Sequence, residues 1–415
     1  MRDETRMLLE SMGRLFEDHC TKQVADAAET GVFPDALWHA VSETGVPLAA
    51  LPESAGGADA EWSDLFAVLR VAGRFAAPIP LAETMLAAWV ASAAGLGVSE
   101  GPMTVGPVRA DDRLTLERDG NGWRLSGRAS RLPWAAQAGQ VVLITDGPDG
   151  EMVVMFGDGV EGAVPSPGRN MAGEPRDTYR FDGLGLAGNV VAPVGPGVNR
   201  AALYRRGALA RAVMMAGAME RALDTAVAYA GERKQFGRQI GKFQAVQQQL
   251  AVMAGQVAAA GAAADAGVEA LSLDDPAMQE FLVAIAKTRV GDAATLASEI
   301  AHQVHGAIGF TKEYSLQLST RRLWENRRCP LAYECLRRNL PNGCGRVASG
   351  AGGAPHRRTA CCSEVPPPIA LSVRVGPNTA TVRSRCDNRR KETFNLRHHL
   401  AVSRPSAPRT GGRAV

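Results

Sequence analysis

The sequence predicts an α+β fold made of an N-terminal α-helical domain, a middle antiparallel β domain and a C-terminal α-helical bundle. Three observations predict it. Apolar residues recur at helical spacing up to about residue 98. From about 103 to 195 they instead form short runs between turn residues, as in strands. From about 200 the helical spacing returns. The predicted domains are residues 1–98, 99–198 and 199–328, followed by a tail over 329–415.

Length and composition indicate a protein with a large core. The chain has 415 residues, of which 46 % are hydrophobic and only 5 % aromatic, and Gly is abundant. This allows two or three domains with closely packed helices. No stretch approaches the roughly 18 uninterrupted apolar residues of a membrane span. Residues 1–20 contain acids and no apolar core, so we expect no secretory signal and a cytoplasmic protein.

The N-terminal part shows helix boundaries. Phe33-Pro34-Asp35 predicts the start of a helix, and Gly45 lies where a left-handed residue commonly ends one. A later helix is expected from Leu81 to about Ala94, where Gly95 ends it. Between them, residues at i, i+3 and i+4 predict a further helix: Leu65, Val68, Leu69 and Ala72.

The middle part contains two hairpin signals. Asp119-Gly120-Asn121 separates the apolar runs 114–117 and 122–125. The turn-forming segment 146–150 separates two strongly apolar runs of the kind found in buried strands. Together they predict a small antiparallel barrel or sandwich.

The C-terminal part contains three long apolar stripes at helical spacing. The first begins near Leu209, the second runs from Ile240 to Ala260, and the third ends near Val304. Asp275-Pro276 is a plausible N-cap and first residue of the third helix. The Ala-rich run 257–266 suits helices that approach closely.

The tail differs from the rest in charge and cysteine content. Residues 326–415 hold 17 Lys and Arg against four Asp and Glu, whereas 1–325 hold 29 against 39. Six of the seven Cys lie in the tail; only Cys20 lies outside it. Without sustained periodicity, the tail predicts disordered or non-native sequence. A zinc module is disfavoured because no Cys-x-x-Cys pair exists, and we expect no metal site. A nucleic-acid arm is disfavoured because aromatic residues are nearly absent there.

The most informative segment is Tyr229–Gln247, which joins two helical patterns through a charged turn with a Phe and a Gly. It closely resembles the helix–turn–helix of the acyl-CoA dehydrogenase family, which are FAD enzymes. The resemblance extends over residues 1–324. It implies that the turn holds the flavin diphosphate of a neighbouring subunit. On segment 229–247 and the later segment Gln303–Phe310, the residues implied to bind the cofactor are Arg233, Phe236, Gln244, Gln303 and Gly306.

The resemblance also implies parts that this chain lacks. The family's flavin-ring loop corresponds to Met103–Asp111, without its acid and Gly-Ser pair. The family's Trp-x-Thr segment corresponds to Arg131–Pro133, where Pro133 has no side-chain donor. The cofactor site therefore resembles one half of the family's site.

No catalytic residue is identified. The family's Tyr-Glu-Gly triplet, which carries the base, corresponds to Cys329-Pro330-Leu331. The alternative position one helix earlier corresponds to Gly207. Glu325 and Glu334 lie near the first position but out of register.

Three functions remain open for this chain. The first is a partner subunit of a heteromeric acyl-CoA dehydrogenase, which lacks the base and shares FAD across an unlike interface. The second is a self-sufficient homo-oligomeric enzyme whose base is not located, and the third is a non-catalytic assembly protein of the same fold. The first two take an acyl-CoA substrate, and none involves nucleic acid. The acyl chain cannot be read from the sequence.

Overall fold

The fold was analysed on a computed structural model, which describes residues 2–109, 111–157, 160–163 and 165–327 and three later strands. The chain divides into two compact units, Met1–Asn339 and Leu340–Val415. The second unit contains an antiparallel sheet of β10 (Ser372–Gly376), β11 (Thr379–Arg383) and β12 (Phe394–Asn395). The rest of the tail, on which the prediction of disordered or non-native sequence falls, lies outside the described residues.

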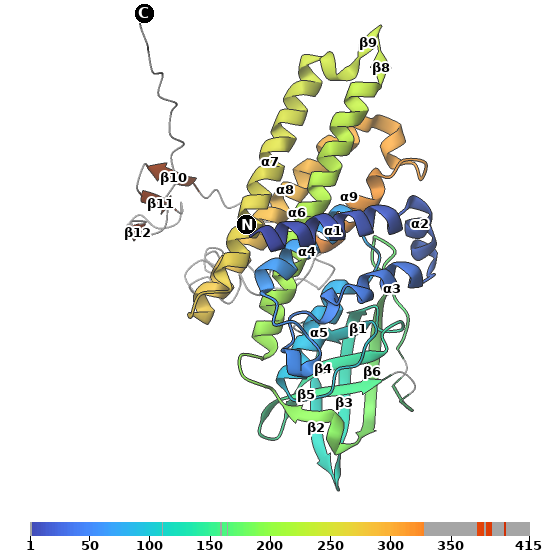
Figure 1. The fold of residues 1–415 in the computed structure, drawn as a ribbon, viewed down its shortest axis with the longest axis vertical. Helices are drawn as coiled ribbons and strands as arrows, with labels where there is room; N and C mark the ends of the chain where they lie inside the picture. Colours follow the sequence, from blue (N-terminus) through green and yellow to red (C-terminus); the bar gives the residue numbers. More distant parts are fainter. Residues whose placement is uncertain are drawn as a thin grey trace, which may run out of the picture. The chain divides into compact units, whose positions relative to one another are not determined.

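The N-terminal helices form where the sequence places helix boundaries (Figure 1). Gly45 has φ 71°, as expected for a left-handed residue after a helix. The predicted helix from Leu81 to about Ala94 ends one residue earlier than expected. The five helices are α1 (Asp3–His19), α2 (Lys22–Thr30), α3 (Asp35–Glu43), α4 (Trp62–Arg74) and α5 (Leu81–Ala93).

The middle part is a seven-stranded sheet in the order β6-β3-β2-β4-β5-β7, with β1 paired to β4. Both predicted hairpins are present, as β2–β3 and β4–β5. The sheet is mixed and not purely antiparallel as expected, because β1 lies parallel to β4 and β2 meets β4 in parallel at one residue pair. The strands are β1 (Met103–Gly106), β2 (Leu114–Asp119), β3 (Gly122–Pro133), β4 (Gln140–Gly147), β5 (Gly150–Gly157), β6 (Arg176–Leu186) and β7 (Val191–Pro193).

The C-terminal part is a bundle around the long helix α6. One continuous core joins α6 to α4, α7, α8 and α9 (Figure 1). The predicted cap is present, since the Asp275 side chain accepts a hydrogen bond from the Ala277 amide at 2.9 Å. The elements are α6 (Arg200–Glu232), β8 (Lys234–Gln235), β9 (Arg238–Gln239), α7 (Gln244–Ala270), α8 (Pro276–His305), the 3₁₀ turn η5 (Gly306–Phe310) and α9 (Leu316–Arg327).

Helix α5 links the sheet to the bundle. It is buried on almost all sides. Its first turns belong to the bundle core, and its apolar residues from Leu86 to Ala91 share a core cluster with residues of β1, β4 and β5. The opposite face of the sheet has its own core. The order of helices, sheet and helices confirms the predicted fold class.

Among the helices that the structure describes, one, α7, is long and apolar enough to cross a membrane by length and composition alone. A single helix of this kind is weak evidence, because core helices pass the same test. One face of α7 contributes Met253, Val257, Ala260 and Ala264 to the bundle core, and 33 % of its apolar window is buried.

Candidate functional site

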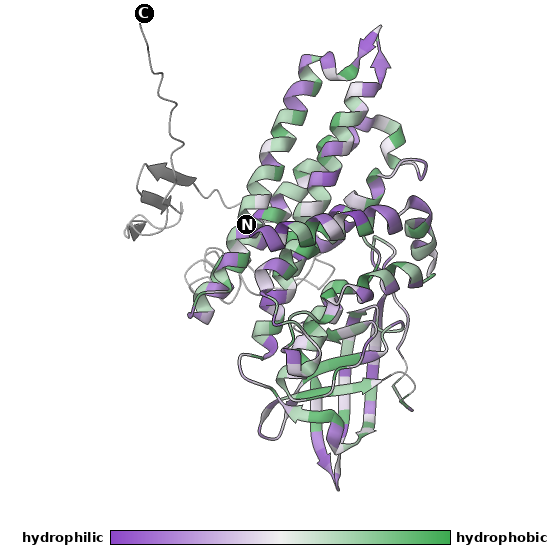
Figure 2. Cartoon of the chain, viewed as in Figure 1, coloured by the Kyte–Doolittle hydropathy of each residue, from purple (hydrophilic) through white to green (hydrophobic). Residues whose placement is uncertain are grey.

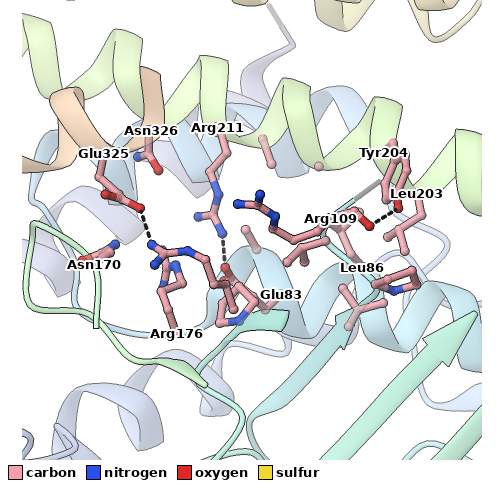
Figure 3. A pocket seen from close by; sticks show the side chains of 18 of the residues that line it. Glu83, Leu86, Arg109, Asn170, Arg176, Leu203, Tyr204, Arg211, Glu325 and Asn326 are labelled. Carbon is pink, nitrogen blue, oxygen red and sulfur yellow. Dashed lines mark hydrogen bonds and ion pairs between the residues drawn. The ribbon is translucent and has the colours of Figure 1, made fainter. Parts of the chain in front are cut away.

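A cavity of about 440 Å³ lies where the sheet, α5, α6 and α9 meet (Figure 3). Its volume is within the range of small-molecule sites. Five arginines and two glutamates line it, together with apolar residues such as Leu86 and Leu203. The charged side chains are Glu83, Arg109, Arg131, Arg169, Arg176, Arg211 and Glu325.

Glu83 and Arg211 form a buried ion pair on one wall (Figure 3). Glu83 is a lone acid on the buried helix α5, and Arg211 reaches it from α6. Both side chains are largely hidden, with 5 % and 14 % of their surfaces exposed. Arg211 therefore supplies the partner that a buried carboxylate requires.

Arg131 and Glu325 form a second pair at 3.1 Å, between the sheet and α9. The pairing of β3 with β6 shifts in register between Ala129 and Leu132, and Arg131 has φ 56°. Such a bulge aims a side chain away from the regular strand direction. Here the Arg131 side chain donates a hydrogen bond to Glu325, and both residues line the cavity.

The loop before β6 is held by a network centred on Glu174. Its carboxylate accepts hydrogen bonds from Arg176 at 2.8 Å and from Arg322 of α9 at 3.1 Å. Asn170 donates a third at 2.8 Å. Burial raises the pKa of Glu174, but the guanidinium groups of Arg176 and Arg322 are among those that outweigh it and lower the pKa to about 2. The network therefore fixes the position of Arg176, which lines the cavity.

The residues predicted to clamp the diphosphate lie elsewhere, at the far end of α6. Arg233 directly follows α6, and its side chain forms no ion pair with the described residues. Phe236, at the tip of the β8–β9 hairpin, is 93 % exposed and has φ 52°. Gln244 is exposed at the start of α7. The hairpin is hydrophilic apart from its tip (Figure 2).

Gln303 and Gly306 lie at the end of α8, where both are exposed. Gly306 has φ 62°, and a Cβ added there would meet nothing within 4 Å. A ligand can therefore approach this backbone closely. His305 stacks on Tyr229 with ring centroids 4.6 Å apart, which holds this end of α8 against the last turns of α6.

Two segments, Met103–Asp111 and Arg131–Pro133, correspond to the ring side of the family's flavin site. Both contribute residues to the cavity. Residues 107–109 line it, as do Arg131 and Pro133. Gly207, the alternative base position, also lines it and offers no side chain. Glu334 and Cys329–Leu331 lie outside the described residues.

The cavity contains functional groups that the sequence analysis missed, above all Glu83 and Arg211. A signal for Glu83 existed, since a single acid in an otherwise apolar helix must find a partner when buried. The sequence could not indicate that Arg211 is the partner of Glu83, because the two residues are 128 positions apart. In the part of the chain that the structure describes, no group of three or more His, Cys, Asp or Glu could hold a metal.

Comparison with known families matches both helical parts of the chain. Residues 2–96 match "Acyl-CoA dehydrogenase, N-terminal domain", and residues 200–328 match "Acyl-CoA dehydrogenase, C-terminal domain". The second match ends where the tail begins.

Curated proteins of the same family are similar over most of the chain. Acyl-CoA dehydrogenase IpdE2 of Mycolicibacterium smegmatis is 29 % identical over 331 residues, which cover 78 % of this chain and 93 % of that protein. Acyl-CoA dehydrogenase FadE34 of Mycobacterium tuberculosis is 30 % identical over 276 residues, covering 66 % of this chain and 37 % of that protein.

Solved structures show the same fold. A variant of the Tcur3481–Tcur3483 steroid ACAD has a TM-score of 0.70 at 26 % identity, and the match covers 81 % of this chain and 96 % of that one. The ChsE4–ChsE5 complex from Mycobacterium tuberculosis has a chain with a TM-score of 0.71 at 22 % identity, with the same coverage.

Proposed function

The chain belongs to the acyl-CoA dehydrogenase family, and on this premise we propose that it is the partner subunit of a heteromeric acyl-CoA dehydrogenase. The proposed enzyme uses FAD to desaturate an acyl-CoA thioester between its α and β carbons. This chain supplies the clamp for the FAD diphosphate. An unlike chain of the same family supplies the ring side of the flavin site and the catalytic base. The proposed location is the cytoplasm.

The observation that carries this proposal is the pairing of both cavity carboxylates. α-Proton abstraction needs a carboxylate that can accept a proton. Glu83 is paired with Arg211, and Glu325 is paired with Arg131. Each carboxylate is thus already engaged by a guanidinium of its own chain. Because both cavity carboxylates are held in ion pairs, this chain is suited to an assembly in which another chain supplies the base.

The separation along α6 supports the sharing of FAD between chains. Arg211 lines the cavity and Arg233 belongs to the clamp. At 1.5 Å per residue, the helix separates them by about 33 Å. A flavin bound at this clamp would therefore place its ring against another chain and not in the cavity of its own.

The exposed groups at the clamp fit an FAD diphosphate. The Arg233 guanidinium can bind phosphate oxygens in a bidentate manner. The open backbone at Gly306 allows close approach of a second anionic or polar group. Phe236 offers an exposed apolar ring in the hairpin that directly follows Arg233. When bound, FAD supplies the hydride acceptor for the desaturation.

Relatives with two unlike chains give the proposal a precedent. The ChsE4–ChsE5 neighbour is a complex of two differently named chains, and the Tcur3481–Tcur3483 neighbour likewise carries two names. Neither name identifies the acyl group that this chain would meet.

The test is reconstitution with a family chain that carries the Tyr-Glu-Gly triplet. We expect this chain alone to show no acyl-CoA dehydrogenation and the complex to show it. Replacing the partner's base carboxylate by an amide should lower turnover by about 10²- to 10⁴-fold. Glu325→Gln in this chain should leave turnover within about threefold. Full turnover by this chain alone would reject the proposal.

A self-sufficient homo-oligomeric enzyme is the second candidate, and Glu325 favours it. Its carboxylate lines the cavity, and only 18 % of its side chain is exposed. If Glu325 were the base, Glu325→Gln would abolish turnover of the isolated chain, whereas Glu325→Asp would retain part of it. The same variants separate the two candidates.

A further inference from the structure

Three aromatic rings meet where the end of α8 lies against α6. The His305 ring stacks on Tyr229 of α6, with ring centroids 4.6 Å apart and ring planes 23° apart. Tyr314, in the loop before α9, contacts both rings, at 4.9 Å from His305 and 5.8 Å from Tyr229. Aromatic rings at such separations attract each other beyond the apolar area that they bury. The cluster therefore joins the last turns of α6 to the end of α8 and to the loop that follows it.

The His305 ring holds α6 by packing and not by hydrogen bonding. Its Nδ1 lies 2.7 Å from the Ala301 carbonyl of its own helix, and because a carbonyl only accepts, Nδ1 carries the proton. Its Nε2 is buried and has no hydrogen-bond partner among the residues that the structure describes. Burial lowers the pKa of His305 below its ordinary value, which favours the neutral ring. The stack on Tyr229 is therefore the contact through which this ring acts on α6.

Both sides of this stack adjoin residues of the proposed FAD clamp. On the α6 side, the Tyr229 carbonyl accepts a hydrogen bond from the Arg233 amide at 2.9 Å. On the α8 side, Gly306 directly follows His305, and Gln303 lies two residues before it. Arg233 and Gly306 are 73 positions apart in the chain, and the stack connects their backbones through one ring on each side. The position of Gly306 relative to Arg233 therefore depends on the His305 ring.

The turn η5 packs tightly onto the same end of α8. Gly309 of this turn is buried, and a Cβ added to it would lie only 3.0 Å from the His305 Cβ. The Phe310 ring stacks on His302, one turn earlier in α8, with ring centroids 4.2 Å apart. Such close packing leaves little room for a shift of the backbone between these contacts. Gly306, the first residue of η5, is therefore held from both sides.

We propose that His305 is a positioning residue of the FAD clamp, whose stacked ring holds Gly306 in a fixed place relative to Arg233 so that both can bind one FAD molecule. The inference rests on the proposed function, which places the FAD diphosphate at this clamp. In this role His305 acts through its neighbours and need not contact the cofactor. Groups that are held in the bound geometry before the ligand arrives bind it more tightly, because less ordering is left to occur on binding. Loss of the stack should therefore weaken FAD binding although every group that contacts FAD is still present.

The experiment titrates FAD into the complex of this chain with a base-carrying family chain and follows FAD fluorescence. His305→Leu removes the ring but keeps an apolar side chain in its place, and Tyr229→Leu removes the ring on the α6 side. His305→Phe keeps a ring that can stack on Tyr229. His39→Leu on α3, where 76 % of the His39 side chain is exposed, is the matched control. Urea denaturation of each variant shows that it is folded before its affinity is compared.

We expect His305→Leu and Tyr229→Leu each to weaken FAD binding by about 3- to 10-fold, the range that the loss of one aromatic contact allows. His305→Phe should restore the affinity to within about twofold of the wild type, because the stack is kept. His39→Leu should leave the affinity unchanged. Wild-type affinity in both Leu variants would overturn the proposal, and so would a His305→Phe variant as weak as His305→Leu.

A double-mutant cycle with Arg233→Ala separates positioning from a general loss of structure. If the stack acts by fixing Gly306 relative to Arg233, His305→Leu should cost less than about twofold in affinity in the Arg233→Ala background. Strictly additive losses would show that His305 supports only the fold, and they would overturn the inference while the proposed clamp stands. An Arg233→Ala variant with unchanged FAD affinity would instead reject the clamp itself, and the inference with it.

Discussion

The two ends of α6 differ in how their charges are balanced. At the cavity end, Arg211 is buried against Glu83, and the adjoining network holds Glu174 between two arginines. At the hairpin end, Arg233 has no ion-pair partner in the described part of the chain, and Phe236 is almost fully exposed. Charges that stabilise this chain are paired within it, whereas those at the hairpin are available to a ligand or another chain. We therefore expect substitutions at the cavity end to lower the stability of the chain and substitutions at the hairpin end to lower its affinity for FAD.

The largest effect is expected from Glu174→Gln, which leaves buried Arg176 and Arg322 without their shared counter-ion. Breaking a buried pair in this way costs roughly 3–5 kcal/mol of unfolding free energy. Urea denaturation at pH 7 measures it. Arg233→Gln is the control at the other end of α6 and should change the free energy by less than about 0.5 kcal/mol. Equal losses in the two variants would remove the distinction between the ends.

Lowering the pH should weaken the ion-pair network around Glu174. The pKa of Glu174 falls from its ordinary 4.5 to about 2 on folding. The resulting stabilisation, roughly 3 kcal/mol, is present above pH 4.5 and is lost as the pH falls towards 2. The stability gap between wild type and Glu174→Gln should therefore narrow over that range. A gap that stays constant from pH 7 to pH 3 would show that Glu174 keeps an ordinary pKa.

At the hairpin end, Arg233→Ala should weaken FAD binding in the assembly with little change in stability. A charge-assisted contact is worth roughly 1.5–3 kcal/mol, which corresponds to about 10- to 150-fold in affinity. FAD fluorescence during titration measures it. Lys242→Ala, a neighbouring exposed cation, should have little effect. Unchanged FAD affinity in Arg233→Ala would place the clamp elsewhere.

The smallest effect is expected at the ion pair between Arg131 and Glu325. The Arg131 side chain is 43 % exposed, so its ion pair with Glu325 is screened by solvent. Arg131→Gln should lower the unfolding free energy by only about 0.2–1 kcal/mol. Urea denaturation of this variant and of Glu174→Gln compares the stability that an exposed ion pair contributes with the stability that a buried one contributes. A loss as large as that of Glu174→Gln would contradict the ranking.

Local features of the fold were predictable from the sequence because neighbouring residues determine them. The Asp119-Gly120-Asn121 turn appears where expected, with Gly120 at φ 59°, and Asp275 caps α8 as its position before Pro276 indicates. The parallel pairing of β1 with β4 was missed, since no local pattern specifies which distant strand a short strand joins.

The cavity was less predictable than the clamp. The proposed clamp residues lie within one contiguous segment and one later turn, so a resemblance over a short stretch was enough to predict them. The cavity pairs instead join residues far apart in the chain, such as Arg131 with Glu325, 194 positions later. The bulge that aims Arg131 also depends on the pairing of two strands, which periodicity alone does not reveal.

The most direct test of the shared-flavin account is the amount of FAD per chain, read from the visible absorption spectrum. We expect the chain purified alone to carry little FAD, because its segment Met103–Asp111 lacks the acid and Gly-Ser pair of the family's flavin-ring loop. The complex with a base-carrying family chain should contain one FAD per pair of unlike chains. One FAD per chain in the isolated protein would contradict the account and favour a self-sufficient enzyme.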